Sequence, residues 1–272
     1  MNEARVRTTV DDGVAEVRLT RPDRRNALDV AMFSAIVHAA HALRDRADVR
    51  AVVLSGEGPD FCAGLDRDMF RAMRSGERLS ATADLPPLPD GSPARATGQR
   101  AVYGWVELPV PVIAAVQGHA LGGGLQIALG ADLRIVAPDA TLSVLEVHWG
   151  LVPDMCGTVL LPELVGRDVA KDLTFTGRRV SGTEAVALGL ATRVDDDPRA
   201  AALATAREIA GLSPHAVRAA TRLLGTTRPP AEQLAAEQAE IGALVGSPNQ
   251  REAVTARLEG RPPVFAAGEP HS

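Results

Sequence analysis

Two glycine-rich segments carry the residues best suited to chemistry in this 272-residue chain. The first is SGEGPDFCAGLD, from Ser55 to Asp66, and the second is QGHALGGGLQ, from Gln117 to Gln126. Glycine lets a backbone turn sharply and approach a ligand, and a helix start has unpaired N–H donors. If both segments lie at one sheet edge, one N–H from each could hold a single oxygen as an oxyanion hole. Taken singly, each segment is better explained as an ordinary turn.

Two acids follow the second segment, Glu146 and Asp154, in the stretch EVHWGLVPD. A carboxyl group in an apolar pocket has a raised pKa and can exchange protons, whereas the amide of Gln126 can only donate and accept hydrogen bonds. Other interpretations stay open at this point. Glu146 could be a solvated loop acid, and Asp154 could cap a helix that starts after Pro153.

Other catalytic templates are missing from the sequence. It has no GxSxG, HExxH or P-loop motif and no GxGxxG after a strand. The six histidines show no metal-ligand spacing. Cys62 and Cys156 are too few for a disulfide framework or a cysteine-rich zinc site. We therefore expect a site without a metal.

The overall composition is that of an ordinary globular protein, with 46% hydrophobic and 23% charged residues. Lys and Arg total 29 against 34 for Asp and Glu, a net charge of −5. This balance argues against nucleic-acid binding, which favours a basic excess. No signal peptide or long apolar run is visible, so we expect a cytoplasmic protein that does not enter a membrane.

The elements that must position these residues alternate between strand and helix. A helix capped by Asp29 has apolar residues at helical spacing up to Leu43, and another helix is expected at 123–128. Strand patterns occur at 14–19, 49–55, 110–116, 133–136 and 142–144. This alternation predicts an α/β fold with a mainly parallel sheet.

Three regions follow from the same patterns. Residues 1–198 form the α/β catalytic core, 199–260 a helical region without strands, and 261–272 a flexible tail. Within the core, prolines and glycines at 80–98 exclude regular structure and predict a long loop that is a lid or an insertion.

The order of the motifs resembles the crotonase superfamily, the enoyl-CoA hydratase/isomerase family. SGxGxxFxAGxD is followed by PVIAAVxGxxxGGG, which starts at Pro111. ADLRIV, EVHWGLVPD, LVGR and TGRRVSGTEA then come in family order. The resemblance covers roughly residues 5 to 260. It implies a spiral of stacked ββα turns with a helical C-terminal region that packs trimers or dimers of trimers.

The resemblance also implies a substrate and the residues that hold it. Family members bind acyl-CoA thioesters, so coenzyme A belongs to the substrate and no separate cofactor is expected. By motif position, the N–H groups of Leu65 and Gly123 would form the oxyanion hole, and the backbone around Ala63 would meet the adenine end of coenzyme A. Asp66 would lie in the same binding segment. Arg24 would contact a phosphate, or is a solvated arginine.

A C-terminal lysine often binds coenzyme A phosphate in the family. The chain has only Lys171, outside that region. Arg257 or Arg261 could take its place.

The reaction depends on the acids around the hole. Family hydratases use two glutamates, and here the first position holds Gln126 while the second holds Glu146. The dienoyl-CoA isomerase branch has EVDVGLxxD, whose two acids match Glu146 and Asp154, although that branch also keeps a carboxylate at position 126 and an Asp at position 148. We therefore expect double-bond isomerisation by proton transfer. The alternatives are hydration with Gln126 holding the water, or a non-catalytic acyl-CoA-binding protein.

Aromatic residues are scarce, at 3%. Five of the eight fall on segments expected to line the acyl pocket: Phe61, Phe70, Tyr103, Trp105 and Trp149. We therefore predict that aliphatic side chains pack the core and that the aromatic rings contact the ligand.

Overall fold

The computed structural model describes residues 4–77, 85–225 and 228–266. Its larger sheet has strands in the order β1, β2, β3, β4, β6 and β9. Their bounds are Val6–Asp11, Val14–Leu19, Ala51–Gly56, Val112–Val116, Leu133–Val136 and Arg193–Val194. Only β1 and β2 pair antiparallel, and the other neighbours pair parallel. The predicted α/β fold with a mainly parallel sheet is thus observed.

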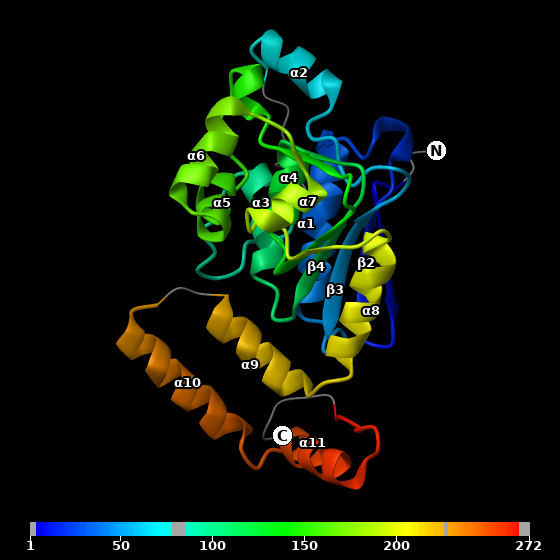
Figure 1. Ribbon diagram of the computed structural model, residues 1–272, viewed down its shortest axis with the longest axis vertical. Helices are drawn as coiled ribbons and strands as arrows, with labels where there is room; N and C mark the ends of the chain where they lie inside the picture. Colours follow the sequence, from blue (N-terminus) through cyan, green and yellow to red (C-terminus); the bar gives the residue numbers. More distant parts are fainter. Residues whose placement is uncertain (1–3, 78–84, 226–227, 267–272) are drawn as a thin grey trace.

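The central strands β3 and β4 are buried throughout because helices cover both faces of the sheet (Figure 1). Successive strand side chains point to opposite faces. Val52 and Leu54 of β3 pack into the main core with α1 (Val30–Arg44), α3 (Thr97–Val106) and α4 (Gly123–Leu129). Val53 packs on the opposite face against α8 (Pro198–Ala210). That helix presents Ala202, Ala206 and Ala210, one turn apart, so it lies close to the sheet.

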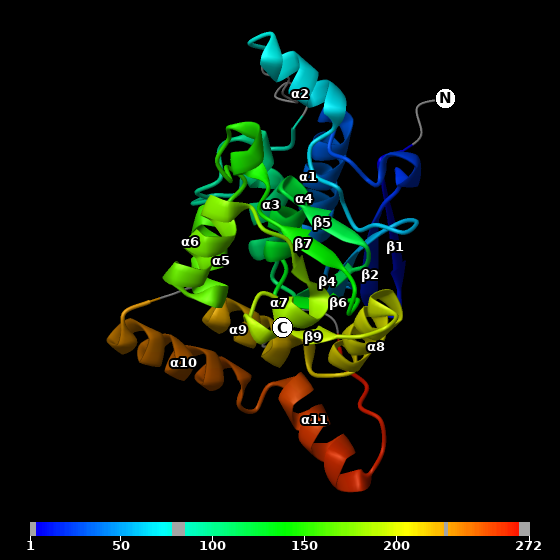
Figure 2. The ribbon, with the colours of Figure 1, turned by 45° about the horizontal axis from the view of Figure 1, so that its top comes forward.

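A smaller sheet carries the second glycine segment. It consists of β5 (His119–Leu121), β7 (Thr141–Ser143) and β8 (Val180–Ser181), with β5 parallel to β7 and β7 antiparallel to β8 (Figure 2). Strand β5 leads directly into α4, and β7 leads into a short 3₁₀ turn, η2 (Glu146–Trp149). Glu146 therefore follows the strand that neighbours the glycine segment.

The remaining helices of the body surround these sheets. They are η1 (Pro22–Arg24), α2 (Arg67–Arg74), α5 (Gly157–Val165), α6 (Arg167–Thr176) and α7 (Gly182–Ala187). Helix α2 extends from one end of the body (Figure 1). Asp29 caps α1 as predicted, because its Oδ1 accepts a hydrogen bond from the Met32 N–H at 2.7 Å.

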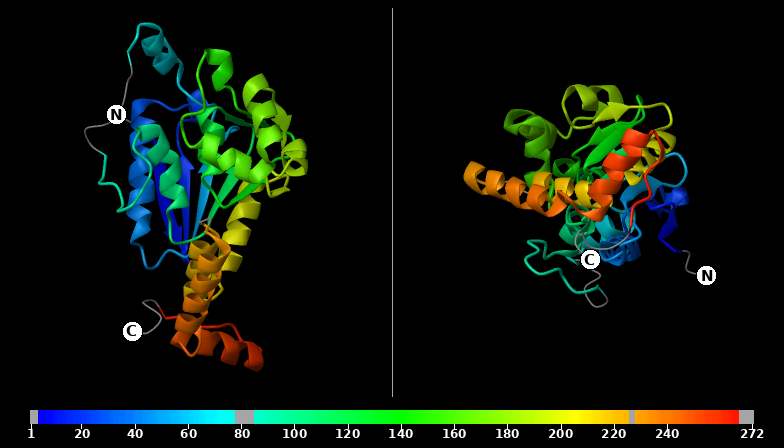
Figure 3. Two further views of the ribbon diagram at one scale, coloured as in Figure 1. Left: turned by 90° about the vertical axis from the view of Figure 1, so that its left-hand side faces the viewer. Right: turned by 90° about the horizontal axis from the view of Figure 1, so that it is seen from below.

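Three C-terminal helices extend beyond the opposite end of the body (Figure 3). They are α9 (Pro214–Leu224), α10 (Pro230–Leu244) and α11 (Pro248–Glu259), and each begins with a proline, whose fixed φ suits a helix start. Helix α9 packs against α10 and α11. The predicted boundary after residue 198 falls at the first residue of α8, which packs on the sheet of the core.

The proline-rich segment departs from the expectation at its end. Residues 85–96 contain no helix or strand, but α3 begins at Thr97, so the last two positions of the predicted irregular segment are helical. Gly98 suits that position because a Cβ atom there would lie 2.8 Å from Cγ of Met155. Residues 80–84 of this segment lie outside the described residues.

The beginning of the predicted tail is attached to α11. Asn249 exchanges two hydrogen bonds with the backbone of Ala266, at 2.9 and 3.0 Å. Residues 267–272 lie outside the described residues. Among the described helices, none is long and apolar enough to cross a membrane.

Candidate active site

Backbone hydrogen bonds hold the two glycine segments side by side. The N–H of Cys62 donates to the His119 carbonyl at 2.8 Å, and the N–H of Leu121 donates to the Cys62 carbonyl at 3.1 Å. Cys62 and Ala120 thus form a parallel bridge. Leu65 and Gly123 each lie three residues beyond it, so the bridge holds the segments that carry them next to each other.

Close approach of the two segments requires glycine at position 64. Gly64 has φ of +85°, and a Cβ atom there would lie 2.5 Å from the Leu121 carbonyl oxygen and 3.7 Å from the Gly123 nitrogen. Any other residue would both strain the backbone and push the segments apart. The short distance also places the loop that ends in Leu65 against the start of α4.

The two predicted oxyanion-hole donors are N–H groups without a hydrogen-bond acceptor among the described residues. Gly123 is the first residue of α4, so its N–H has no partner within the helix. Within the described ranges, no oxygen accepts a hydrogen bond from the N–H of Leu65 or of Gly123. Two such N–H groups, side by side, can stabilise a negative oxygen.

The amide of Gln126 is held in one orientation by three hydrogen bonds. Its Oε1 accepts from the N–H of Met155 at 2.9 Å and from the N–H of Gly157 at 3.0 Å, and its Nε2 donates to Oε1 of Glu146 at 2.6 Å. Cys156 between the two donors has φ of 67°, a left-handed conformation that turns both N–H groups the same way. The side chain is almost fully buried.

Glu146 has one engaged and one unengaged carboxylate oxygen. Oε1 accepts from Gln126 and lies against Gly122, where a Cβ atom would be 3.4 Å away. Among the described residues, no group hydrogen-bonds to the buried Oε2. Burial raises the pKa of Glu146 above its usual value, and the charge of Asp154 raises it further, against hydrogen bonds from the backbone and from Gln126. The group is therefore suited to exchange protons. The interpretation of Glu146 as a solvated loop acid is wrong, because the residue is only 9% exposed.

Asp154 is exposed and acts on Glu146 through its charge. It does not cap a helix, because α5 begins at Gly157 and its N-cap is Cys156. The helix-cap interpretation is therefore wrong. Asp154 is a second acid near Glu146, at the solvent side of the site.

Two of the five aromatic residues stack on each other near Glu146. The rings of Phe70 and Trp149 have centroids 4.2 Å apart and planes at 23°. Phe61 and Trp105 instead belong to the main core, so the prediction that rings are kept for the ligand is wrong for these two. Phe61 is buried because its segment pairs with residue 117 at the sheet edge, and Trp105 because α3 packs against α1 and α4. Tyr103 is half-buried on α3.

The residues predicted to bind coenzyme A lie around the Leu65 loop. Ala63 is half-buried, and its N–H donates to the Arg25 carbonyl at 2.9 Å. Arg24 is exposed and 3.8 Å from the exposed carboxylate of Asp23. Asp66 is buried and engaged, because it pairs with Arg21 at 2.6 Å and accepts from the Asp68 N–H at the start of α2.

The C-terminal cations lie elsewhere. Arg261 pairs with Glu252 and Glu259 beside α11, and Arg257 lies on α11. In this chain α11 is at the opposite end of the molecule from α2 (Figure 1). Neither residue joins the site within one chain.

Asn26 is a site residue that the sequence did not reveal. It is fully buried with φ of 55°, and its amide joins the η1 turn to the first glycine segment. Oδ1 accepts from the Arg21 N–H at 2.8 Å, and Nδ2 donates to the carbonyls of Glu57 and Asp60 at 3.0 and 2.8 Å. Asn tolerates a left-handed backbone better than most residues, which is the one signal its type offers.

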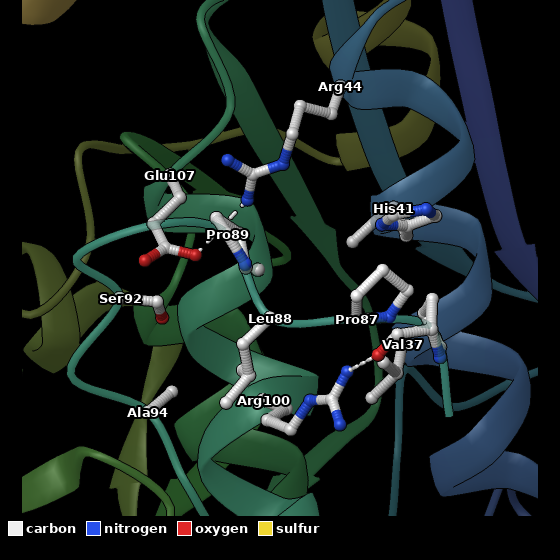
Figure 4. Close-up of a pocket in the computed structure, with 13 residues that line it drawn as sticks. Val37, His41, Arg44, Pro87, Leu88, Pro89, Ser92, Ala94, Arg100 and Glu107 are labelled. Atoms are coloured by element: carbon white, nitrogen blue, oxygen red, sulfur yellow. Dashed lines mark hydrogen bonds and ion pairs between the residues drawn. The ribbon is translucent and has the colours of Figure 1, made fainter. Parts of the chain in front are cut away.

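The proline-rich segment packs away from Glu146. Pro86, Pro87 and Pro89 line a cavity with Val37 and Arg44 of α1 and with α3 (Figure 4). Arg100 of α3 donates to the Pro86 carbonyl. None of the predicted catalytic or binding residues lines this cavity. The described part of the predicted lid therefore lies on α1 and α3.

Known proteins are similar to this chain in sequence and in fold. A family model described as Enoyl-CoA hydratase/isomerase matches residues 9–268. Human enoyl-CoA hydratase domain-containing protein 2, mitochondrial, is 38% identical over 215 residues, 76% of this chain and 69% of that protein. The enoyl-CoA hydratase structure from Bacillus anthracis has 27% identity and a TM-score of 0.83, covering 97% of this chain and all of that one. That from Mycobacterium tuberculosis H37Rv has 29% identity and a TM-score of 0.82, covering 98% and 100%.

These likenesses confirm the predicted crotonase-like fold with its helical C-terminal region. The family model spans the glycine segments, Gln126 and Glu146 alike. The chain belongs to the enoyl-CoA hydratase/isomerase family.

Proposed function

We propose that this protein moves a carbon–carbon double bond along the acyl chain of a coenzyme A thioester. The observation that carries the proposal is the difference in hydrogen bonding between the side chains of Glu146 and Gln126. Glu146 keeps one buried oxygen without a protein partner, whereas Gln126 has its oxygen occupied by two backbone donors. Among the described residues, Oε2 of Glu146 is therefore the oxygen of this pair that is left to exchange a proton.

The proposed reaction needs one base and one oxyanion hole. The N–H groups of Leu65 and Gly123 hold the thioester oxygen. Oε2 of Glu146 removes a proton from C2 of a 3-enoyl thioester, and the electron pair moves into the enolate. The same carboxyl group then returns the proton to C4 while the enolate collapses and the double bond forms between C2 and C3. The raised pKa of Glu146 helps both halves because the group must accept and release the same proton.

Hydration requires a water molecule that is held by acceptors as it attacks. Oε1 of Gln126 already accepts two hydrogen bonds, so only the carboxylate of Glu146 supplies acceptors that the pair can offer a water. This favours isomerisation. The opposing consideration is that the similar solved structures carry the name enoyl-CoA hydratase.

Asp154 supplies a second carboxylate for a longer proton path. A conjugated 3,5-dienoyl thioester needs a proton removed at one end of the chain and added at the other. Asp154 is close enough for its charge to raise the pKa of Glu146, and its side chain is exposed to solvent. We therefore assign it the distal proton.

The test is a panel of 3-enoyl-, 3,5-dienoyl- and 2-enoyl-CoA followed by ultraviolet absorbance. Isomerisation of a 3-enoyl thioester creates the conjugated absorbance, and hydration of a 2-enoyl thioester removes it. Glu146→Gln should abolish isomerisation, and Asp154→Asn should slow only the dienoyl substrate. Full activity of Glu146→Gln would refute the mechanism. Robust hydration by the parent would establish the hydratase alternative, and tight acyl-CoA binding without turnover would establish a binding protein.

We also propose that Arg24 and the backbone at Ala63 contact coenzyme A, which enters as part of the substrate. Ala63 lies on the loop that leads to Leu65, and its N–H donates to the carbonyl of Arg25, the residue that follows Arg24. An Arg24→Ala variant should raise KM for a thioester while leaving kcat unchanged, because a phosphate contact acts equally in the ground and transition states.

We further propose that the protein self-associates through its C-terminal helices. Leu224, Leu234, Ile241 and Leu258 are all more than half exposed on α9, α10 and α11. Apolar exposure of this extent on projecting helices favours a homotrimer or a dimer of trimers, in which these side chains become buried.

A further inference from the structure

The indole ring of Trp149 lies next to the proposed catalytic acid. Glu146 and Trp149 are the first and last residues of η2. In a 3₁₀ turn, side chains three residues apart project on the same side, about 6 Å apart along the axis. Glu146 points into the protein, while Trp149 is 59% exposed. A ring surface this open is unusual for tryptophan, which is highly buried on average.

Phe70 covers one part of this ring and fixes its position. The stacked pair joins two segments of the site, because Phe70 belongs to α2, which begins directly after the Leu65 loop, and Trp149 belongs to the Glu146 turn. The remaining surface of the indole is uncovered. Leu151 and Met73, from the same two segments, are also partly exposed. These apolar side chains thus lie on the segments that follow the Leu65 loop and Glu146 in the chain.

We propose that the uncovered face of Trp149 binds the acyl group and selects flat, aromatic or conjugated acyl groups over saturated ones of equal size. The inference rests on the proposed function, because it requires a thioester held by Leu65 and Gly123. A planar π-system can stack on the indole as Phe70 does, and such ring pairs gain affinity beyond the area they bury. A puckered saturated ring buries similar area without that gain.

The test uses two unreactive ligands of nearly equal size, phenylacetyl-CoA and cyclohexylacetyl-CoA. Their dissociation constants are measured by calorimetry for the parent, Trp149→Leu and Phe70→Leu. We expect the parent to bind the phenyl ligand roughly 3- to 10-fold more tightly. Trp149→Leu should bring the two dissociation constants within about twofold of each other, mainly by weakening the binding of the phenyl ligand. Phe70→Leu should reduce the preference less, because it loosens the indole without removing it.

Two controls separate the possible outcomes. Coenzyme A alone tests whether its adenine, the other planar ring in the ligand, stacks on Trp149. The affinity for coenzyme A should be the same for the parent and Trp149→Leu. Trp105→Leu serves as the reference for loss of an indole in the core. Equal binding of both thioesters, or a preference that survives Trp149→Leu, overturns the inference but leaves the proposed function standing. Equal weakening of coenzyme A overturns the acyl assignment. Failure of the parent to bind either thioester overturns the proposed function as well.

Discussion

At the scale of single residues, burial of the ionised Glu146 carboxyl group lowers the folding stability of the protein. Its carboxyl group is buried beside the charge of Asp154, and its pKa is raised above 4.5, the value of an unperturbed glutamate. The folded state therefore binds this proton more tightly than the unfolded chain does. By linkage, folding stability falls as pH rises from about 4.5 through the raised pKa, and the penalty is absent below both values.

Glu146→Gln should remove this pH dependence. The replacement keeps an oxygen that can accept from Gln126 and has no charge to bury. We expect the variant to be at least as stable as the parent at pH 7, with a difference that vanishes as the pH falls below about 4.5. Urea unfolding at several pH values measures it. A parent that gains stability relative to the variant on raising the pH would contradict the burial of this charge.

Asn26 contributes through a conformation and three hydrogen bonds at once. Asn26→Ala leaves the Arg21 N–H and two carbonyl groups without partners and strains the left-handed backbone. We expect a loss on the order of 2 to 4 kcal/mol, seen as a lower urea midpoint. Asn26→Gly relieves the backbone alone and should recover about 1 kcal/mol of the loss. Equal stability of the alanine variant and the parent would show that these hydrogen bonds are dispensable.

The site residues differ in how far the sequence predicted them. Leu65, Gly123, Gln126 and Glu146 follow from motif order, and the structure brings their segments together. The orientation of the Gln126 amide could not be predicted, because it depends on backbone donors at residues 155 and 157 and on the left-handed turn between them. Backbone N–H groups are common to nearly all residue types, so a sequence pattern does not mark them.

At the scale of elements, helix α8 is attached to the sheet by charge as well as by its alanine stripe. Glu16 of β2 accepts from Arg199 at 2.6 and 2.8 Å, from Arg18 and from Ser55. Burial alone would raise the pKa of Glu16, but these hydrogen bonds outweigh it and hold the pKa at about 2. The ionised carboxylate thus stabilises the contact between β2 and α8.

Glu16→Gln should weaken this contact in a pH-dependent way. We expect a loss on the order of 1 to 2 kcal/mol at pH 7, after allowing for the partial exposure of Arg199. Because the folded pKa is lowered, the contribution of Glu16 is fully present above about 4.5 and is lost as the pH falls toward 2. Arg199→Met is the matched variant. If the two substitutions act on one interaction, the double variant loses less than the sum of the single ones.

Sequence patterns predicted β2, β3, β4, β6 and β7 because their signal is local, but they did not predict β1, β5, β8 or β9. Ala51–Gly56 and Val112–Val116 are short, fully buried apolar runs, and the glycine-rich turns that follow them were visible in the sequence. The turn η2 was not predicted, since four residues are too few for a helical period. The core positions of Phe61 and Trp105 were also missed, because the sequence did not show which neighbours would enclose each ring.

At the scale of the whole molecule, the C-terminal helices expose apolar side chains to solvent in a single chain. Leu234 and Ile241 are seven residues apart on α10, which places them on one face of the helix, and both are exposed. The sequence predicted consecutive helices here, but the direction in which they leave the body depends on the connection after α8. An exposed apolar helix face of this kind is typical of an interaction surface.

Replacing both apolar residues with arginine should break self-association. We expect sedimentation velocity to give an oligomer for the parent and a smaller species for Leu234→Arg/Ile241→Arg. Glu232→Arg, on an exposed position of the same helix, is the control for added positive charge. A parent that sediments as a monomer would refute the proposed assembly, and an unchanged double variant would exclude α10 from the interface.

The backbone donors that hold the side chain of residue 126 also bear on how such proteins diverge. The N–H groups of Met155 and Gly157 would hold a carboxylate oxygen as readily as the amide oxygen they hold now. Gln and Glu have the same shape, and a single nucleotide change converts a codon of one into a codon of the other. A glutamate here would face Glu146 across the present 2.6 Å contact, and the two acids would then share a proton. One mutation, with no repacking, would therefore place a second carboxyl group in direct contact with Glu146.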